Sequence, residues 1–166
     1  MSAGQGTRLQ KPVVSGVGGD ELFQGYESFR ELPRLVTARR ALGRLPGSAS
    51  LLRWAADRRS RRTGNHRWHH LPEWSTSMAG AWWLRRSLFA PEDLPGLMGE
   101  DAARESLRGF TAEGFVGRMS GALPTDARLA LGQIESTTYL RNQLLRDSDW
   151  ASMDHSVELR TPLVDA

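Results

Sequence analysis

Apolar residues recur at intervals of three and four positions through most of the chain, which is the spacing of amphipathic helices. Proline, glycine and serine separate these stretches and mark their ends. Pro33 is a point at which the first helix can break, Ser75 or Ser77 can cap the third, and residues 63–72 are expected to form a loop. The pattern predicts helices over residues 27–42, 48–56, 77–88, 101–107, 112–119, 126–146 and 149–155.

One segment has strand character. Residues 12–14 (PVV) form a short β-branched run that ends in the glycine-rich residues 15–21 (SGVGGDE). This pattern predicts a buried strand that enters a loop close to a ligand, followed by a helix capped by Asp20. A single strand has nothing to pair with, so we expect a piece of a larger α/β sheet whose other strands lie outside the chain. The polar residues 1–11 are expected to be poorly ordered.

Composition narrows the class of protein. The 166 residues include no cysteine, which excludes a disulfide framework and a cysteine nucleophile. No apolar run approaches the roughly 18–20 residues that span a bilayer, and the N-terminus lacks the apolar core of a signal peptide. We therefore expect a cytoplasmic protein with no membrane partner.

Positive charge is concentrated in one part of the chain. Residues 33–72 carry ten arginines and one acid, Asp57, which gives +9 within a net charge of +3. We interpret this block as a set of solvated helix faces and do not expect nucleic acid as a partner. A nucleic-acid-binding surface is the alternative from a different class of function.

The glycine loop lacks the common nucleotide fingerprints. No GxxxxGK[ST] occurs, and Glu21 stands where GxGxxG needs its third glycine. A strand, glycine loop and helix still favour a phosphate or adenosine site, because backbone amides there attract anions. Asp20 and Glu21 repel bare phosphate, so a metal-bound nucleotide or an amino group is the expected neighbour.

Other polar clusters are weaker candidates. Asp149, Ser152 and His155 share a helical face, but one helix rarely places nucleophile and base in line. The three histidines of residues 66–70 lack the glutamate of a metalloprotease motif. Tryptophans 68, 74, 82 and 83 are expected to pack in a core or an interface.

Two runs of residues carry a family resemblance. Residues 13–26 (VVSGVGGDELFQGY) resemble a signature of the asparagine synthetase (glutamine-hydrolysing) family, a strand followed by SG[DE]GxDELFxGY in its synthetase domain. Residues 149–165 (DWASMDHSVELRTPLVD) resemble the second block, DRxSMAxSLExRxPFLD. The two occur in the family order and cover about 31 residues directly.

The resemblance implies the α/β fold of the ATP pyrophosphatases, an adenine-nucleotide alpha-hydrolase-like fold. This chain is then a mainly α-helical piece of it with one short strand of the parallel type, and residues 12–166 form a partial synthetase domain. The implied activity is ATP-dependent amide formation, which converts aspartate to asparagine through an acyl-adenylate. The implied cofactors are ATP and Mg²⁺, and the implied partners are a carboxylate substrate and a glutaminase domain or subunit that supplies ammonia.

The resemblance also assigns roles residue by residue. Ser15 and Gly16 match positions whose backbone contacts ATP, and Gly18 and Gly19 complete that loop. Asp20 and Glu21 match acids beside the substrate. The residues that match the pocket wall are Glu158, Arg160 and Asp165. Such acids can hold an amino group or magnesium, and an arginine can clamp a carboxylate.

The chain departs from the family pattern at several positions. Val17 replaces an acid linked to adenylate formation, Trp150 replaces arginine and Asp154 replaces alanine. Neither the pyrophosphate loop SGGxDS nor the glutaminase cysteine occurs, so we expect the isolated chain to be inactive. Two alternatives stay open: a related adenylating amide former of the lasso-peptide macrocyclase or β-lactam synthetase type, and a non-catalytic remnant with an arginine-rich surface for nucleic acid.

Overall fold

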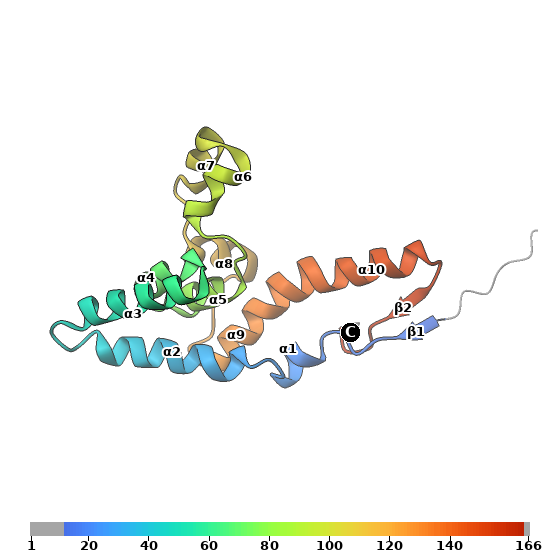
Figure 1. Ribbon diagram of the computed structural model, residues 1–166. Coiled ribbons are helices and arrows are strands. Elements are labelled where there is room, and N and C mark those ends of the chain that lie inside the picture. Colours follow the sequence, from blue (N-terminus) through green and yellow to red (C-terminus); the bar gives the residue numbers. More distant parts are fainter. Residues whose placement is uncertain (1–11, 165–166) are drawn as a thin grey trace, which may run out of the picture.

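The computed structural model describes residues 12–164, and the expectation for residues 1–11 lies outside this range. The chain is mainly helical, as predicted (Figure 1). The elements in chain order are β1 (Pro12–Val14), α1 (Gly19–Phe23), α2 (Ser28–Leu42), α3 (Ser48–Thr63), η1 (His66–His70), α4 (Leu71–Trp74), α5 (Met78–Arg86), η2 (Pro91–Asp93), α6 (Leu94–Met98), α7 (Glu100–Leu107), α8 (Ala112–Ser120), α9 (Ala127–Glu135), η3 (Ser136–Leu144), α10 (Leu145–Asp154) and β2 (Glu158–Arg160).

The expectation of one strand was wrong, because β1 has a partner inside the chain. β2 pairs with β1 in parallel, with Val13 opposite Leu159. The expectation of a buried strand was also wrong, since all three β1 residues are exposed and Val14 retains 70% of its accessible surface. Residues 156–160 (SVELR) alternate between polar and apolar side chains, which is typical of a strand. The strand itself has only three residues, too few to distinguish it from a turn in the sequence.

Several predicted helix boundaries change. α2 runs through Pro33, because the missing N–H removes one hydrogen bond while Leu32 and Val36 hold the helix in the core. The loop predicted at 63–72 instead contains η1 and α4. The two helices predicted around residue 147 are one continuous helix from Ala127 to Asp154, whose middle segment, η3, is π-helical.

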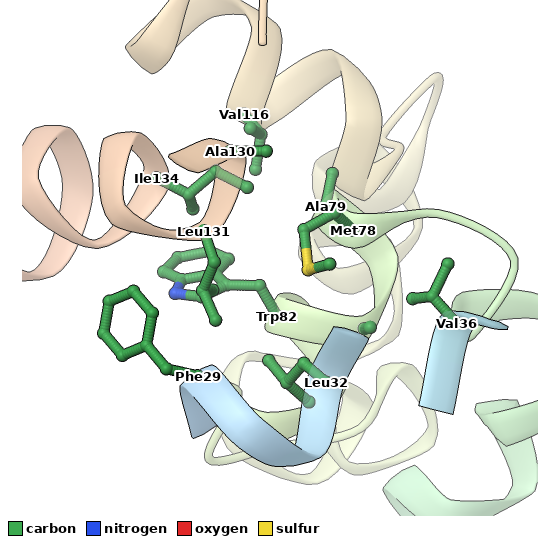
Figure 2. Close-up of a cluster of buried hydrophobic side chains, with 11 residues drawn as sticks. Phe29, Leu32, Val36, Met78, Ala79, Trp82, Val116, Ala130, Leu131 and Ile134 are labelled. Atoms are coloured by element: carbon green, nitrogen blue, oxygen red, sulfur yellow. The ribbon is translucent and has the colours of Figure 1, made fainter. Parts of the chain in front are cut away.

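The core lies where α2, α5, α8 and α9 meet. Figure 2 shows Phe29 and Leu32 on α2 near Trp82 on α5 and Leu131 on α9, with Val36 farther along α2 on the side of Met78. The remaining members of this buried cluster are Met78, Ala79, Ala81, Val116, Ala130 and Ile134. These positions follow the helical spacing of the sequence, and their burial fixes the relative placement of the four helices.

The long helix formed by α9, η3 and α10 connects the core to the strands. α9 packs on the core at one end, and α10 contacts β2 at the other, so the two-stranded sheet lies at the opposite end of the molecule from α3 (Figure 1). α6 and α7 form a separate arm. Within residues 12–164 no helix is both long and apolar enough to cross a membrane.

Candidate functional site

The parallel pairing of β1 and β2 brings together two sequence blocks that lie far apart in the chain. Pro12, Val13 and Val14 lie opposite Glu158, Leu159 and Arg160 in register. The pairing continues past the strand, because the Ser15 N–H donates to the Arg160 carbonyl at 2.8 Å. The glycine loop and the residues after β2 therefore meet at the carboxyl ends of two adjacent parallel strands, the edge at which open α/β sheets bind ligands.

The glycine loop closes by its own hydrogen bonds. The Val17 N–H donates to the Ser15 Oγ at 3.2 Å, and the Gly19 N–H donates to the Gly16 carbonyl at 3.1 Å. Gly18 has φ +92°, and a Cβ there would lie 2.6 Å from the Val164 Cγ2, so this position requires glycine. Gly16 is exposed with open space around its Cα, which leaves its backbone accessible to a ligand.

Asp20 faces solvent, but it is not the helix cap that the sequence predicted. Gly18 occupies that position in a left-handed conformation, and Asp20 lies in the first turn of α1. The Asp20 carboxylate lies directly over Gly25, where any side chain would collide with it. Gln24 ends the helix with φ +57°, and the Gly25 N–H donates to the Asp20 carbonyl at 2.9 Å. The GDELFQG sequence thus holds an exposed carboxylate next to the glycine loop.

Glu158 and Arg160 lie on β2 beside the loop. Both are exposed, and the Arg160 Nε donates to the Glu158 Oε1 at 3.0 Å. Exposed pairs of this kind contribute little to stability, so either side chain is free to change partner when a charged ligand arrives. Asp165, the third residue of the predicted pocket wall, lies outside the described residues.

Glu21 differs from Asp20 because its side chain is buried, with 4% exposed. The Tyr26 hydroxyl donates to its Oε1 at 2.9 Å, and among the described residues no donor reaches its Oε2. Burial raises the pKa of Tyr26 well above its usual value, and the hydrogen bond to Glu21 and the negative charges of Glu21 and Asp20 raise it further. Glu21 therefore faces the helical core rather than the solvent side of the loop.

Behind this pair lies an ion pair between the buried Glu135 and the half-buried Arg86. Glu135 on α9 is fully buried, and it accepts from the Arg86 Nη2 at 2.9 Å and from the Arg86 Nε at 3.3 Å. The Arg86 guanidinium also stacks 3.7 Å from the ring centroid of Tyr139 and lies 5.1 Å from that of Tyr26. Burial raises the pKa of Glu135, and the charge of Arg86 opposes that shift. The network connects the DELFQGY segment to α5 and α9.

The other polar clusters have local partners. The Ser152 Oγ donates to the Asp149 backbone carbonyl rather than to a catalytic partner. His66, His69 and His70 each contact a different carboxylate, those of Asp93, Asp57 and Glu92 respectively, at 2.9–3.0 Å. Over residues 12–164 no three His, Asp or Glu side chains are grouped so that they could hold a metal ion. Trp82 is buried and Trp83 packs against the core, as predicted.

Comparison with known protein families matches the asparagine synthase family over residues 8–166. This match spans almost the whole chain and both signature blocks. The chain belongs to the asparagine synthase family. No curated protein and no solved structure gives a significant match. Members of the asparagine synthase family are ATP-dependent ligases that form amides from carboxylate substrates.

The loop residues are compatible with the ATP that the family uses. Gly16 offers an accessible backbone, and Ser15 lies at the carboxyl end of β1. Asp20 and Glu158 are exposed oxygen donors of the type that Mg²⁺ prefers, but they do not belong to any three-residue metal group among the described residues. A magnesium ion would therefore depend on the nucleotide phosphates for further ligands.

Four residues of this region were not singled out from the sequence: Tyr26, Arg86, Glu135 and Tyr139. Tyr26 is the last residue of the signature at residues 13–26, but the sequence does not show that its hydroxyl bonds to Glu21. Glu135 follows Leu131 and Ile134 on the buried face of α9, and a carboxylate on such a face needs a cationic partner. Nothing in the sequence identified Arg86 as that partner.

Proposed function

We propose that this chain supplies the carboxylate-binding side of an ATP-dependent amide-forming ligase of the asparagine synthase type, with aspartate as substrate. The observation that carries the proposal is the parallel pairing of β1 with β2. This pairing supports the proposal because it sets the glycine loop, which follows β1 and leads to Asp20, beside the strand that carries the Glu158–Arg160 pair. If residues 15–21 formed only a local turn, they would not need to lie beside residues 158–160.

Each exposed residue has a role that suits its chemistry. Arg160 would exchange its bond to Glu158 for a substrate carboxylate, which guanidinium groups bind well. Asp20 and Glu158 would hold the substrate ammonium group. Ser15, Gly16 and Gly19 would form the surface against which ATP lies, and the buried Gly18 would hold the loop in its conformation. Glu21 is buried against Tyr26, so we assign it to positioning the loop and α1 rather than to contact with substrate.

The reaction has two steps in this proposal. A side-chain carboxylate oxygen of aspartate attacks the α-phosphorus of ATP, the bond from that phosphorus to the bridging oxygen breaks, and pyrophosphate leaves. Ammonia then attacks the acyl carbon, loses a proton and releases AMP, which gives asparagine. ATP supplies the leaving group, and the residues of this chain orient the carboxylate.

We further propose that the polypeptide of residues 1–166 does not form the adenylate by itself. Its sequence contains no SGGxDS loop and no cysteine. Its two-stranded sheet is open, because Val13 and Val14 are exposed, whereas parallel sheets are normally covered on both faces. Aspartate-dependent release of pyrophosphate by the purified chain, above a protein-free control, would overturn this part of the proposal.

The alternative within the same chemistry concerns the substrate. Val17 has no group that can accept a hydrogen bond or take up a proton, so the carboxylate that is activated need not belong to aspartate. A related adenylating enzyme of the lasso-peptide macrocyclase or β-lactam synthetase type would activate a different carboxylate. Preference among L-aspartate, L-glutamate and a peptide carboxylate separates these possibilities.

Calorimetric binding tests the proposed function. The full chain should bind L-aspartate in preference to L-glutamate, and binding should be lost in Asp20→Asn and in Arg160→Gln. Asp101→Asn and Arg104→Gln on α7 are matched controls, because they make the same changes in an exposed ion pair remote from the loop. Equal losses in the controls, or binding that survives both loop variants, would contradict the proposal.

A further inference from the structure

One exposed side of α3 has a stripe of apolar and cationic side chains. Leu51, Trp54, Arg58 and Arg61 follow at intervals of three, four and three residues, so they lie on one helical face. The opposite face is buried through Ala56 and Ser60. Trp54 retains 60% of its accessible surface, which is unusual for a tryptophan in a monomeric domain.

A shallow groove runs along this stripe. It has a volume of about 390 Å³ and is lined by Trp54, Asp57, Arg58, Arg61 and Arg62. Asp57 is the only acid of residues 33–72, and its carboxylate is already paired with the His69 Nδ1 at 2.9 Å. The groove therefore presents an indole ring and several guanidinium groups.

The arginines around the groove have no acidic partners. Among the described residues, no ion pair includes any of the ten arginines of residues 33–72. Arg39 and Arg67 donate to backbone carbonyls instead, and Arg59 stacks on Trp68 at 4.0 Å. Three of these arginines, Arg58, Arg61 and Arg62, line the groove beside Trp54, and we call them the arginine face. Arg34, Arg40, Arg44 and Arg53 are also exposed but do not line the groove.

Arginine side chains also crowd one another around Arg67 on η1, which does not line the groove. The pKa of Arg67 is lowered by burial and by the positive charges of Arg85 and Arg59. A cluster of like charges without counter-charges raises the energy of the folded chain, and an anionic partner relieves that repulsion. The arginine face extends from Arg58 to Arg62, over more than one turn of α3.

Although the sequence pattern favoured solvated helix faces without a nucleic-acid partner, we propose from the groove that the arginine face and Trp54 bind single-stranded nucleic acid. Guanidinium groups bind phosphates through paired hydrogen bonds, and an exposed indole provides a surface on which an unpaired base stacks. The Arg58 guanidinium lies 5.7 Å from the Trp54 ring centroid. A base stacked on the indole would therefore have a cation close enough to contact the phosphate of the same nucleotide. This side of α3 exposes only two large apolar side chains, Leu51 and Trp54, beside the three arginines of the groove. So small an apolar surface favours a nucleic acid over the apolar layer of a membrane.

The test is fluorescence anisotropy of the full chain with a labelled oligothymidine of about 15 nucleotides, a length that such surfaces contact. We expect binding that weakens more than about tenfold between about 50 and 200 mM salt. Trp54→Ala should weaken it by about 5- to 150-fold. Arg58→Gln/Arg61→Gln should weaken it by at least about tenfold and reduce the salt slope by about 1.4.

The matched control is Arg104→Gln/Arg108→Gln, which removes the same charge from α7 and the residue that follows it, where both arginines are paired with acids. Circular dichroism confirms that each variant is folded. Equal weakening by the control pair, binding unaffected by Trp54→Ala, or binding that does not change with salt overturns the proposal. Tighter binding to the duplex, to heparin or to phosphatidylserine vesicles than to the single strand also overturns it.

Discussion

Replacement of Arg86 by methionine leaves the Glu135 carboxylate buried without its counter-charge. Both oxygens of Glu135 accept from Arg86, at 2.9 and 3.3 Å, and the glutamate side chain is fully buried. Removing one partner of such a pair costs about 3–5 kcal/mol of the free energy of unfolding. A domain has only about 5–15 kcal/mol in total, so we expect Tm to fall by about 6–20 °C.

The loss of stability in Arg86→Met should depend on pH. Burial raises the pKa of Glu135 and Arg86 lowers it, so the pKa rises further in Arg86→Met. A carboxyl group whose pKa is raised by folding holds its proton in the folded state after the unfolded chain has lost it. Stability therefore falls as pH rises above about 4.3 toward the folded-state pKa. The deficit of Arg86→Met should be smaller at about pH 5 than at about pH 8.

Urea unfolding followed by circular dichroism at the two pH values measures this deficit. The neighbouring Arg85→Met is the control, because Arg85 is exposed, its nearest contact with Glu31 is 3.9 Å, and pairs of this kind contribute about 0–1 kcal/mol. Arg86→Met/Glu135→Leu should recover much of the loss, since apolar replacements of buried pairs are often neutral. A deficit below about 1 kcal/mol, or one that is equal at both pH values, would refute the reasoning.

Three further predictions concern the loop and the sheet. Gly18→Ala should destabilise the chain by about 1–3 kcal/mol in thermal unfolding, because φ is +92° and the new Cβ would lie 2.6 Å from the Val164 Cγ2; a loss near zero would mean that the loop is not held in this conformation. Spectrophotometric titration should show one tyrosine that ionises later than usual, and Tyr26→Phe should remove that late phase, because burial and Glu21 raise the Tyr26 pKa. The pair Val13→Cys/Leu159→Cys should oxidise readily to a disulfide in this cysteine-free chain, because the two residues are opposite in register; faster oxidation of a pair one residue out of register would contradict the pairing.

The sequence allowed the helical class and much of the core to be predicted, because helix spacing is a local property. Leu131 and Ile134 are buried where that spacing puts them, and Asp126 caps α9 by accepting from the Arg128 and Leu129 N–H groups. The predicted helix boundaries were wrong where tertiary packing outweighs the local conformational preference of a residue. Pro33 lies inside α2 because Leu32 before it and Val36 after it are held in the core.

The site was predicted in part. Residues 15–21 and 158–160 were identified as blocks, but their contact through a parallel strand pair depends on the path of the whole chain between them. Asp20 and Glu21 are adjacent in sequence and were treated alike, yet one faces solvent and the other the core. The burial of Glu21 depends on Tyr26 and on packing of α1 against α9, which spacing along the chain does not reveal.

The central claim is that residues 15–20 and 158–160 form a single carboxylate site. Amide chemical shifts of the ¹⁵N-labelled chain, followed during titration with L-aspartate, test this claim most directly. We predict that both segments shift with the same dissociation constant and that Asp20→Asn abolishes the shifts in both. Shifts confined to one segment, different dissociation constants for the two, or changes centred elsewhere on the chain would contradict the account.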